Sequence, residues 1–507
     1  MPHNRFVIAG HGTHLERVFN RRAFEGRTKP IGPQRQRKGP ILLLPMSPTD
    51  SMFLLGESRD HPMHVGGLAL FEPPDGANAR DVRAMLDAAL ARGTVAPLLR
   101  KRARRSATTL GQWGWDTDVA VDLDHHVRHD ALPAPGGTTQ LMELVARLHS
   151  GLLDRSRPLW EMHLIEGLTD GRFAVYMKIH HALADGVSAM KLLRSALSED
   201  PDTTGMPAPW EPLVRERPAL HLVPDPPTSS AGRLDLPAAA LRAARGAAGD
   251  VAGMLPAIAA TLGRASRGHG GPLTLSAPKS MLNVPIGGAR RFAARSWPLE
   301  RLRLVAKFAD ATVNDVVLAM CSGALRIYMR DQGALPTEPL IAMVPVSLRG
   351  ERQETKAGNE IGVLMCNLAT HLTDPAGRLD TVRASMREGK DAMRTRSSAQ
   401  ILAMSALGTA PLALGMFGIG GPIRPPNVMI SNVPGPSTPL YWNGARMSAL
   451  YPLSIPVDGQ ALNITCTSTD EQIAFGLTAC RRALPPLAPL LDHLDDELGD
   501  LEQAVGL

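Results

Sequence analysis

Residues 180–186 read His-His-Ala-Leu-Ala-Asp-Gly, and they follow an apolar run at residues 173–179. The length and alternation of that run predict a half-buried strand, and residues 187–197 have the pattern of a helix. The motif therefore lies in the loop between a strand and a helix, where a rigid strand end can hold a catalytic base. Histidine titrates near neutral pH, so one side chain can take a proton from a hydroxyl group and pass it on. We expect Asp185 to anchor the loop through a basic partner and Gly186 to leave room for a ligand near the backbone.

Two simpler interpretations of the histidine pair stand beside the catalytic one. Two adjacent histidines are often buried for structural reasons alone. They can also belong to a metal site, but such a site needs further ligands, and the sequence has no HExxH motif and no cysteine pair at metal spacing. We therefore expect no metal.

Four further motifs accompany the histidines, and each marks a different part of the chain. They are Pro-Leu-Trp-Glu at 158–161, Asn-Asp-Val-Val at 314–317, Val-Pro-Val-Ser-Leu-Arg at 344–349 and Ser-Asn-Val-Pro-Gly-Pro at 431–436. The opening segment, Leu-Pro-Met-Ser-Pro-Thr-Asp at 44–50 with Met-His-Val-Gly at 63–66, adds a fifth. Together with HHxxxDG, these motifs occur in the order found in the bacterial wax ester synthase/diacylglycerol acyltransferase family, which the chain resembles over roughly residues 44–500.

The resemblance implies an acyl-CoA-dependent O-acyltransferase. A long-chain acyl group would pass from CoA to the hydroxyl of diacylglycerol, giving triacylglycerol, or to that of a long-chain fatty alcohol, giving a wax ester. Acyl-CoA would be a substrate, and no cofactor is expected. Both lipid acceptors imply contact with a membrane or lipid-droplet surface.

The resemblance also implies roles for individual residues. His181 would be the general base, His180 would support its geometry, and Asp185 would be structural, with Gly186 beside them. Asn314 is the first candidate for a donor to the developing oxyanion. The residues expected to bind substrate or to line the channel are Pro158, Leu159, Trp160, Asn314, Asp315, Ser347, Ser431, Asn432, Pro434 and Gly435.

The chain divides into two mixed α/β halves around a Pro-rich segment. We expect a basic, disordered head at 1–43, an acyltransferase-like domain at 44–200, a Pro/Ala-rich linker with a helix (238–265) at 201–288, and a second such domain at 289–507. The predicted strands of the second domain are 340–346, 363–372, 427–433, 462–468 and 472–478, and its helices include 299–309, 313–331 and 487–504. The resemblance adds the fold: two chloramphenicol-acetyltransferase-like domains with the active site in a channel between them.

The positive charge is confined to the N-terminal head. Residues 1–40 hold nine Lys and Arg against two Glu, a balance of +7, whereas the rest of the chain has 46 basic and 47 acidic residues, a balance of −1. A general nucleic-acid surface is therefore not expected. The head could contact anionic lipid, or it could be a tail that precedes the true start at Met46.

The compartment follows from the cysteines and from the apolar segments. Four cysteines without paired spacing indicate a reduced, cytoplasmic protein, and the N-terminus lacks the apolar core of a signal peptide. Residues 397–423 carry no charge, but their glycines and polar residues argue against a transmembrane helix. We expect this segment to line an apolar cavity or to lie on a membrane face.

Other functions need other sequence features. A condensation-type acyltransferase that makes another ester would share the fold, and a lipid-binding protein without activity would share the cavity. A serine hydrolase is excluded by the lack of a G-x-S-x-G elbow, and a nucleotide-binding enzyme by the lack of a Walker A or Rossmann fingerprint. Acyl-CoA turnover separates an enzyme from a lipid carrier.

Overall fold

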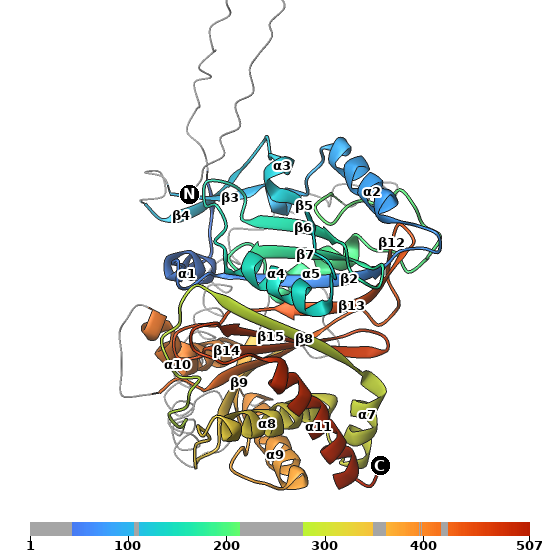
Figure 1. Ribbon diagram of the computed structural model, residues 1–507. Coiled ribbons are helices and arrows are strands. Elements are labelled where there is room, and N and C mark those ends of the chain that lie inside the picture. Colours follow the sequence, from blue (N-terminus) through green and yellow to red (C-terminus); the bar gives the residue numbers. More distant parts are fainter. Residues whose placement is uncertain are drawn as a thin grey trace, which may run out of the picture. The chain divides into compact units, whose positions relative to one another are not determined.

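Two six-stranded sheets organise the part of the chain that the computed structural model describes (Figure 1). The described residues are 43–105, 111–212, 277–347, 361–394, 396, 398–416 and 424–507, and they belong to one compact unit that begins at Leu43. The basic head and the helix predicted at 238–265 lie outside the described residues. Two mixed sheets with helices on their faces confirm the predicted mixed α/β class.

The first half supplies most of one sheet. Its strands are β1 (Leu44–Pro45), β2 (His64–Glu72), β3 (Lys101–Arg105), β4 (Trp113–Thr117), β5 (Val127–Ala131), β6 (Trp160–Glu166) and β7 (Phe173–His180). Its helices are α1 (Pro48–Gly56), α2 (Ala79–Arg92), α3 (Leu123–His126), α4 (Thr138–Ser150) and α5 (Gly186–Ser195), with a 3₁₀ turn at Pro97–Arg100. The large sheet has the order β12-β13-β2-β7-β6-β5, and β1, β4 and β3 form a small separate sheet.

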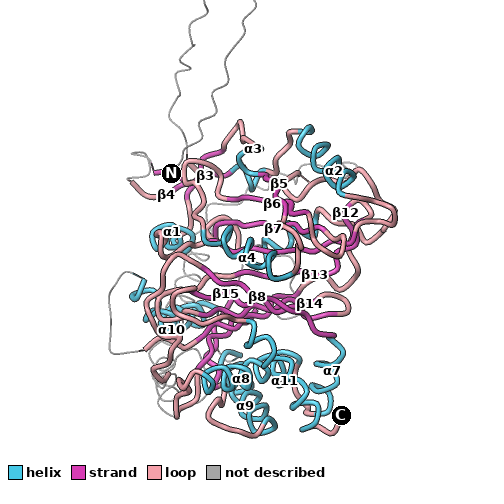
Figure 2. Tube along the Cα trace, in the orientation of Figure 1, coloured by secondary structure: helices cyan, strands magenta, loops and turns pink. Residues whose placement is uncertain are grey.

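The second half builds the other large sheet, with the order β10-β9-β11-β14-β15-β8. Its strands are β8 (Arg290–Pro298), β9 (Ile341–Ser347), β10 (Ile361–Asn367), β11 (Val428–Pro434), β12 (Tyr441–Trp442), β13 (Ala445–Leu453), β14 (Leu462–Ser468) and β15 (Gln472–Cys480). Its helices are α7 (Leu299–Phe308), α8 (Val313–Asp331), α9 (Pro375–Arg394), α10 (Ser398–Met416) and α11 (Ala488–Ala504). Helices α7, α8, α9 and α11 lie together along this sheet (Figure 2), and α8 is buried along most of its length.

The predicted strands and helices of the second half are confirmed to within about two residues, apart from one strand end. Strand β10 ends at Asn367 and not at residue 372, because Ala369 has a positive φ of 51°. The backbone N–H of Ala369 donates a hydrogen bond to the Asn367 side chain. Such a left-handed residue ends an extended strand.

The sheets do not follow the linear division of the chain. Strand β13 comes from the second half, yet it pairs antiparallel with β2 in the first sheet and also packs against β14 and β15. Gly476 in β15 permits this crossing, because a Cβ atom at that position would collide with the backbone carbonyl oxygen of Pro452 in β13. The sequence contains no local signal for this exchange.

We predict that Gly476→Ala lowers the free energy of unfolding by about 1–3 kcal/mol, the usual cost of forcing extra atoms into packed structure. The matched control is Gly499→Ala in α11, where an added Cβ meets nothing within 4 Å and alanine favours the helix. Denaturant unfolding of both variants measures the difference. Equal stabilities for the two variants would show that the close approach of β13 to β15 is not required.

Candidate active site

One apolar pocket of about 630 Å³ joins the two halves of the chain. Its floor is formed by β2, β7 and β13, helix α5 covers it, and β11 and β14 of the second sheet contribute its other wall. No residue of α5 is fully buried, although its inward side chains are apolar, because they face this cavity. A pocket of this size and character suits an apolar ligand.

The end of β7 places His181 in the pocket. Its backbone N–H donates to the Met63 carbonyl oxygen at 2.8 Å, and the His180 N–H donates to that of Leu159 at 3.0 Å. Side chains alternate along an extended segment, so His181 projects into the pocket while His180 projects to the opposite, buried face. The Phe53 ring of α1 stacks on the His181 imidazole, with 4.0 Å between centroids and 20° between planes.

The His181 imidazole favours its neutral form. Burial lowers its pKa below the ordinary value of 6.5, and the nearby His180 acts in the same direction. A hydrogen bond to its own backbone and the charge of Asp185 oppose the shift without reversing it. A neutral imidazole can accept a proton at physiological pH, which a general base requires.

His180 is held by a buried group of polar side chains. Its Nδ1 accepts a hydrogen bond from the Ala182 N–H at 3.0 Å, and its Nε2 faces Glu57 Oε1 at 3.3 Å. Glu57 also accepts from Arg155 Nε at 2.8 Å. Burial tends to raise the pKa of Glu57, but His180 and Arg155 outweigh it and lower that pKa, so the carboxylate stays charged. The arrangement fixes the His180 ring, consistent with a supporting position.

Two more histidines support the strand from behind. His64 pairs with His180 across β2 and β7, and its Nε2 donates to the His149 carbonyl oxygen at 2.8 Å. The Tyr176 hydroxyl lies 2.8 Å from His149 Nδ1. Burial holds the pKa of His64 well below its ordinary value and lowers that of His149 to about 3, so both rings stay neutral and serve as hydrogen-bonding structure.

Asp185 caps the helix that follows the histidine motif. Its carboxylate accepts a hydrogen bond from the Ser188 N–H at 2.7 Å, so Asp185 is the N-cap of α5 and satisfies one of the free N–H groups at the helix start. No ion pair joins Asp185 to a described residue, and the expected basic partner stays a prediction. Gly186 lines the pocket, and a Cβ there would meet nothing closer than Val433 Cγ2 at 3.9 Å.

The C-terminal part of β11 lines the pocket. Ser431, Asn432 and Pro434 line it, whereas Gly435 lies against β14, where a Cβ would collide with the Ser468 carbonyl oxygen. Ser347 is the last residue of β9, and its side chain lies outside what the structure describes.

The structure places Asn314 and Asp315 away from this pocket. They lie in the first turn of α8, where Asp315 and Thr312 form a capping box: Thr312 Oγ1 donates to Asp315 Oδ2 at 2.7 Å. Helix α8 packs on the face of the second sheet opposite to Met429 and Thr465, which line the pocket. Neither residue is among those that line the pocket, and helix capping accounts for the place of Asp315, so their predicted contact with substrate stays a prediction.

Pro158, Leu159 and Trp160 do not line the pocket either. Leu159 and Trp160 are fully buried in the first-half core, and Trp160 Nε1 donates to the Leu99 carbonyl oxygen at 2.8 Å while its ring stacks on His126. The large apolar side chain of Trp160 is used for core packing, and the predicted channel wall at this segment stays a prediction. Leu159 still matters to the site, because its carbonyl oxygen accepts from the His180 N–H.

Several pocket residues were not predicted. Phe53 stacks on His181, Gly67 forms part of the floor, Thr465 adds a hydroxyl from β14, and Thr409 comes from α10. Thr409 places part of the uncharged 397–423 segment at the cavity. Among the described residues, no helix is long and apolar enough to cross a membrane.

Comparisons with known proteins identify the family of the chain. The profile of the wax ester synthase/diacylglycerol acyltransferase catalytic domain matches residues 46–317, and that of the family's C-terminal domain matches residues 357–502. A putative diacylglycerol O-acyltransferase of Mycobacterium tuberculosis is 55% identical over 461 residues, 90% of either chain. A probable diacylglycerol O-acyltransferase of the same species, tgs2, is 49% identical over 91% of this chain and 99% of its own.

A solved structure of the same family also matches this chain. The wax ester synthase/diacylglycerol acyltransferase of Marinobacter aquaeolei matches with a TM-score of 0.73 and 41% identity, over 92% of this chain and all of that one. The first condensation domain of the calcium-dependent antibiotic synthetase matches with a TM-score of 0.53 at 16% identity, over 92% of this chain and 97% of its own, which shows a shared fold alone. The chain therefore belongs to the wax ester synthase/diacylglycerol acyltransferase family, a family of acyltransferase enzymes.

Proposed function

We propose that the protein transfers a long-chain acyl group from CoA to the free hydroxyl of diacylglycerol, with long-chain fatty alcohols as a second class of acceptor. The observation that carries the proposal is the neutral His181 imidazole inside a large apolar pocket. Relatives named as diacylglycerol O-acyltransferases support this choice of acceptor.

His181 would act as general base in a direct transfer. As the hydroxyl oxygen attacks the thioester carbonyl carbon, the imidazole takes the hydroxyl proton. The carbon–sulfur bond then breaks, and the proton passes to the departing thiolate to give free CoA. Because the thioester is already activated, no covalent acyl-enzyme is needed.

The negative charge on the carbonyl oxygen needs donors in the same pocket. Because Asn314 is not among the residues that line the pocket and the Thr465 hydroxyl donates to Asn463 Oδ1 at 2.8 Å, we assign this role to the Ser431–Asn432 segment, which lines the pocket. Asp185 contributes by capping α5 and so holding the loop that carries His181.

The test is turnover of palmitoyl-CoA with 1,2-dioleoylglycerol and, in parallel, with hexadecanol. We predict that His181→Ala lowers acceptor-dependent thiol release by about 10²–10⁴-fold, the usual contribution of a general base. His163→Ala is a control at a buried histidine of the first half outside the pocket. Near-normal turnover in folded His181→Ala protein would remove His181 from the mechanism, and binding without turnover by the wild type would favour a lipid carrier.

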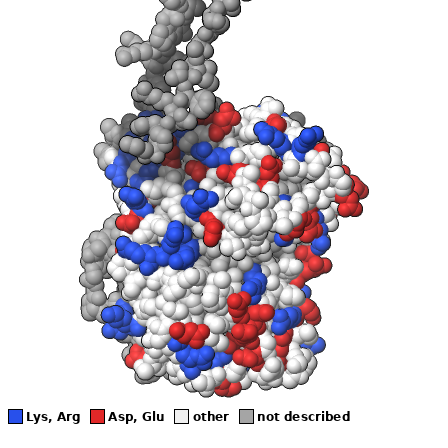
Figure 3. Space-filling view, in the orientation of Figure 1, with Lys and Arg blue, Asp and Glu red and all other residues white. Residues whose placement is uncertain are grey.

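The lipid acceptor requires contact with a lipid surface. A diacylglycerol has about thirty acyl methylenes, and at about 0.8 kcal/mol each its release into water would cost about 25 kcal/mol. We propose that α1 makes this contact, because Met52 and Leu55 are 49% and 53% exposed while Phe53 between them lines the pocket. Acidic side chains gather over α11 on the face shown in Figure 3, so that surface would be repelled by anionic lipid.

We predict that Met52→Ser together with Leu55→Ser weakens binding to phosphatidylglycerol-containing vesicles several-fold and leaves turnover in detergent micelles nearly unchanged. Phe308→Ser, at a 59% exposed residue of α7, is the matched control. Vesicle flotation measures the binding. Unchanged flotation of the double variant would place the lipid contact elsewhere, with the basic head as the next candidate.

A further inference from the structure

We propose that a wall of three aromatic rings, Phe71, Phe173 and Trp442, sets the longest acyl chain that the pocket accepts from the donor. The inference rests on the proposed function, because it assumes that His181 meets the thioester. It assigns these rings and Gly67 a role in chain-length specificity.

The floor of the pocket is a ladder of paired residues that leads away from the histidines. Side chains on one face of β2 and β7 pair in the order Val65 with Ile179, Gly67 with Met177, Ala69 with Val175, and Phe71 with Phe173. The first three pairs line the pocket, and the fourth does not. Gly67 has no side chain and Ala69 has only a methyl group, so the middle of this floor fills little of the pocket.

Gly67 is the most open point of the floor. A Cβ atom added there would meet only Leu450 Cδ1, at 3.8 Å, and the glycine does not have a positive φ. Met190 and Leu193 of α5 and Pro209 line the same pocket. This part of the pocket is therefore an apolar passage, which suits an acyl chain.

The wall closes this passage. The Phe71 and Phe173 rings stack with centroids 5.3 Å apart, and Trp442 packs against both at 6.0 and 6.4 Å. All three side chains are almost fully buried. Trp442 is held in place by a hydrogen bond from its Nε1 to the Pro207 carbonyl oxygen at 3.3 Å.

The length of the ladder gives the chain length. The six residue steps from His181 to Val175, both of which line the pocket, span about 20 Å. An extended polypeptide covers about 3.5 Å with three backbone bonds, so an extended alkyl chain covers about 1.2 Å per bond. The passage therefore holds a chain of about sixteen carbons.

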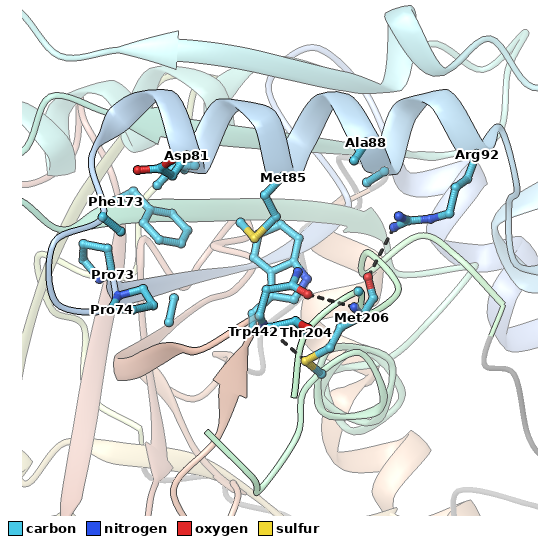
Figure 4. Close-up of a pocket in the computed structure, with 16 residues that line it drawn as sticks. Pro73, Pro74, Asp81, Met85, Ala88, Arg92, Phe173, Thr204, Met206 and Trp442 are labelled. Atoms are coloured by element: carbon cyan, nitrogen blue, oxygen red, sulfur yellow. Dashed lines mark hydrogen bonds between the residues drawn. The ribbon is translucent and has the colours of Figure 1, made fainter. Parts of the chain in front are cut away.

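A second cavity of about 330 Å³ lies behind the wall, under α2. Figure 4 shows Phe173 and Trp442 on its border, with Met85 projecting from α2 and Met206 on the opposite side. Phe173 is thus the ring that separates two existing cavities: its neighbour Val175 on the same strand face lines the first, and Phe173 itself lines the second. Removing this ring would connect them.

We assign the passage to the acyl donor, because it lies along the strands that lead from His181 to the wall of rings. A diacylglycerol brings two chains, and we assign it to the part of the pocket lined by the second half, near Val363, Thr409 and Met429. The donor and acceptor can therefore be tested separately by varying one chain length at a time.

The first experiment uses Gly67→Leu, with Gly499→Leu as the control at an open glycine outside the pocket. Values of kcat/KM are measured for octanoyl-, palmitoyl- and docosanoyl-CoA with dioleoylglycerol as fixed acceptor. We expect the palmitoyl/octanoyl ratio to fall at least about tenfold, since each methylene excluded from an apolar site costs about fourfold. A uniform loss over all three donors would overturn the proposal.

The second experiment uses Phe173→Ala, with Phe475→Ala as a control for loss of a buried ring in the core of the second half. We expect the docosanoyl/palmitoyl ratio to rise at least about tenfold in Phe173→Ala alone. An unchanged ratio in folded protein, or a shift in the profile of fatty-alcohol acceptors in place of donors, would overturn the assignment. If Phe173→Ala does not fold, the change in the palmitoyl/octanoyl ratio of Gly67→Leu alone decides whether the chain-length proposal stands.

A binding measurement keeps this inference separate from the proposed function. Calorimetric titration with acyl-CoA of increasing length, without acceptor, should give affinities that rise to about sixteen carbons and then level off. Gly67→Leu should move that plateau to shorter chains. If the affinity levels off near sixteen carbons but the enzyme shows no turnover, the proposed acyl transfer is rejected and the chain-length limit is kept. If the enzyme turns over but the affinity shows no plateau, the chain-length limit alone is rejected.

Discussion

The backbone pairing at the end of β7 is the constraint on which the site depends. Strands β2 and β6 flank this end, and the residues directly before them, Met63 and Leu159, accept hydrogen bonds from the N–H groups of His181 and His180. Because side chains alternate along the strand, this pairing sends one histidine into the pocket and the other into a buried polar group. A slip of one residue would exchange the two positions, turning His180 toward the pocket and His181 toward Glu57.

The pocket exists only because the two halves share strands. β13 leaves the second half and pairs with β2, so the same strand that completes the floor also packs against β14 and β15. The remaining walls come from α5 in the first half and from β11 and β14 in the second. The pocket around His181 is therefore built from elements that are far apart in sequence, and a change in how the two sheets pack would alter it directly.

Local patterns predicted the mixed α/β class, most strands and helices of the second half, and the place of the histidine motif between a strand and a helix. They did not predict on which side of a sheet a motif lies. Asn314 and Asp315 carry the spacing of a capping box, and Trp160 is a large apolar residue, so both were better explained by helix capping and core packing than by substrate contact. Phe53 and Gly67 could not be found, because their roles arise from the packing of α1 on His181 and from the register of β2 with β7.

The central claim is that His181 stands neutral and ready to accept a proton in the folded enzyme. Its imidazole pKa can be measured by NMR titration of labelled histidine, with His181→Gln used to assign the signal. We predict a pKa below 6.5, because burial disfavours the charged ring, so that the base form prevails at neutral pH and is lost as the pH falls through this value. A pKa above 6.5 would mean that the ring is stabilised as a cation, and it would contradict the account of His181 as a general base in an apolar pocket.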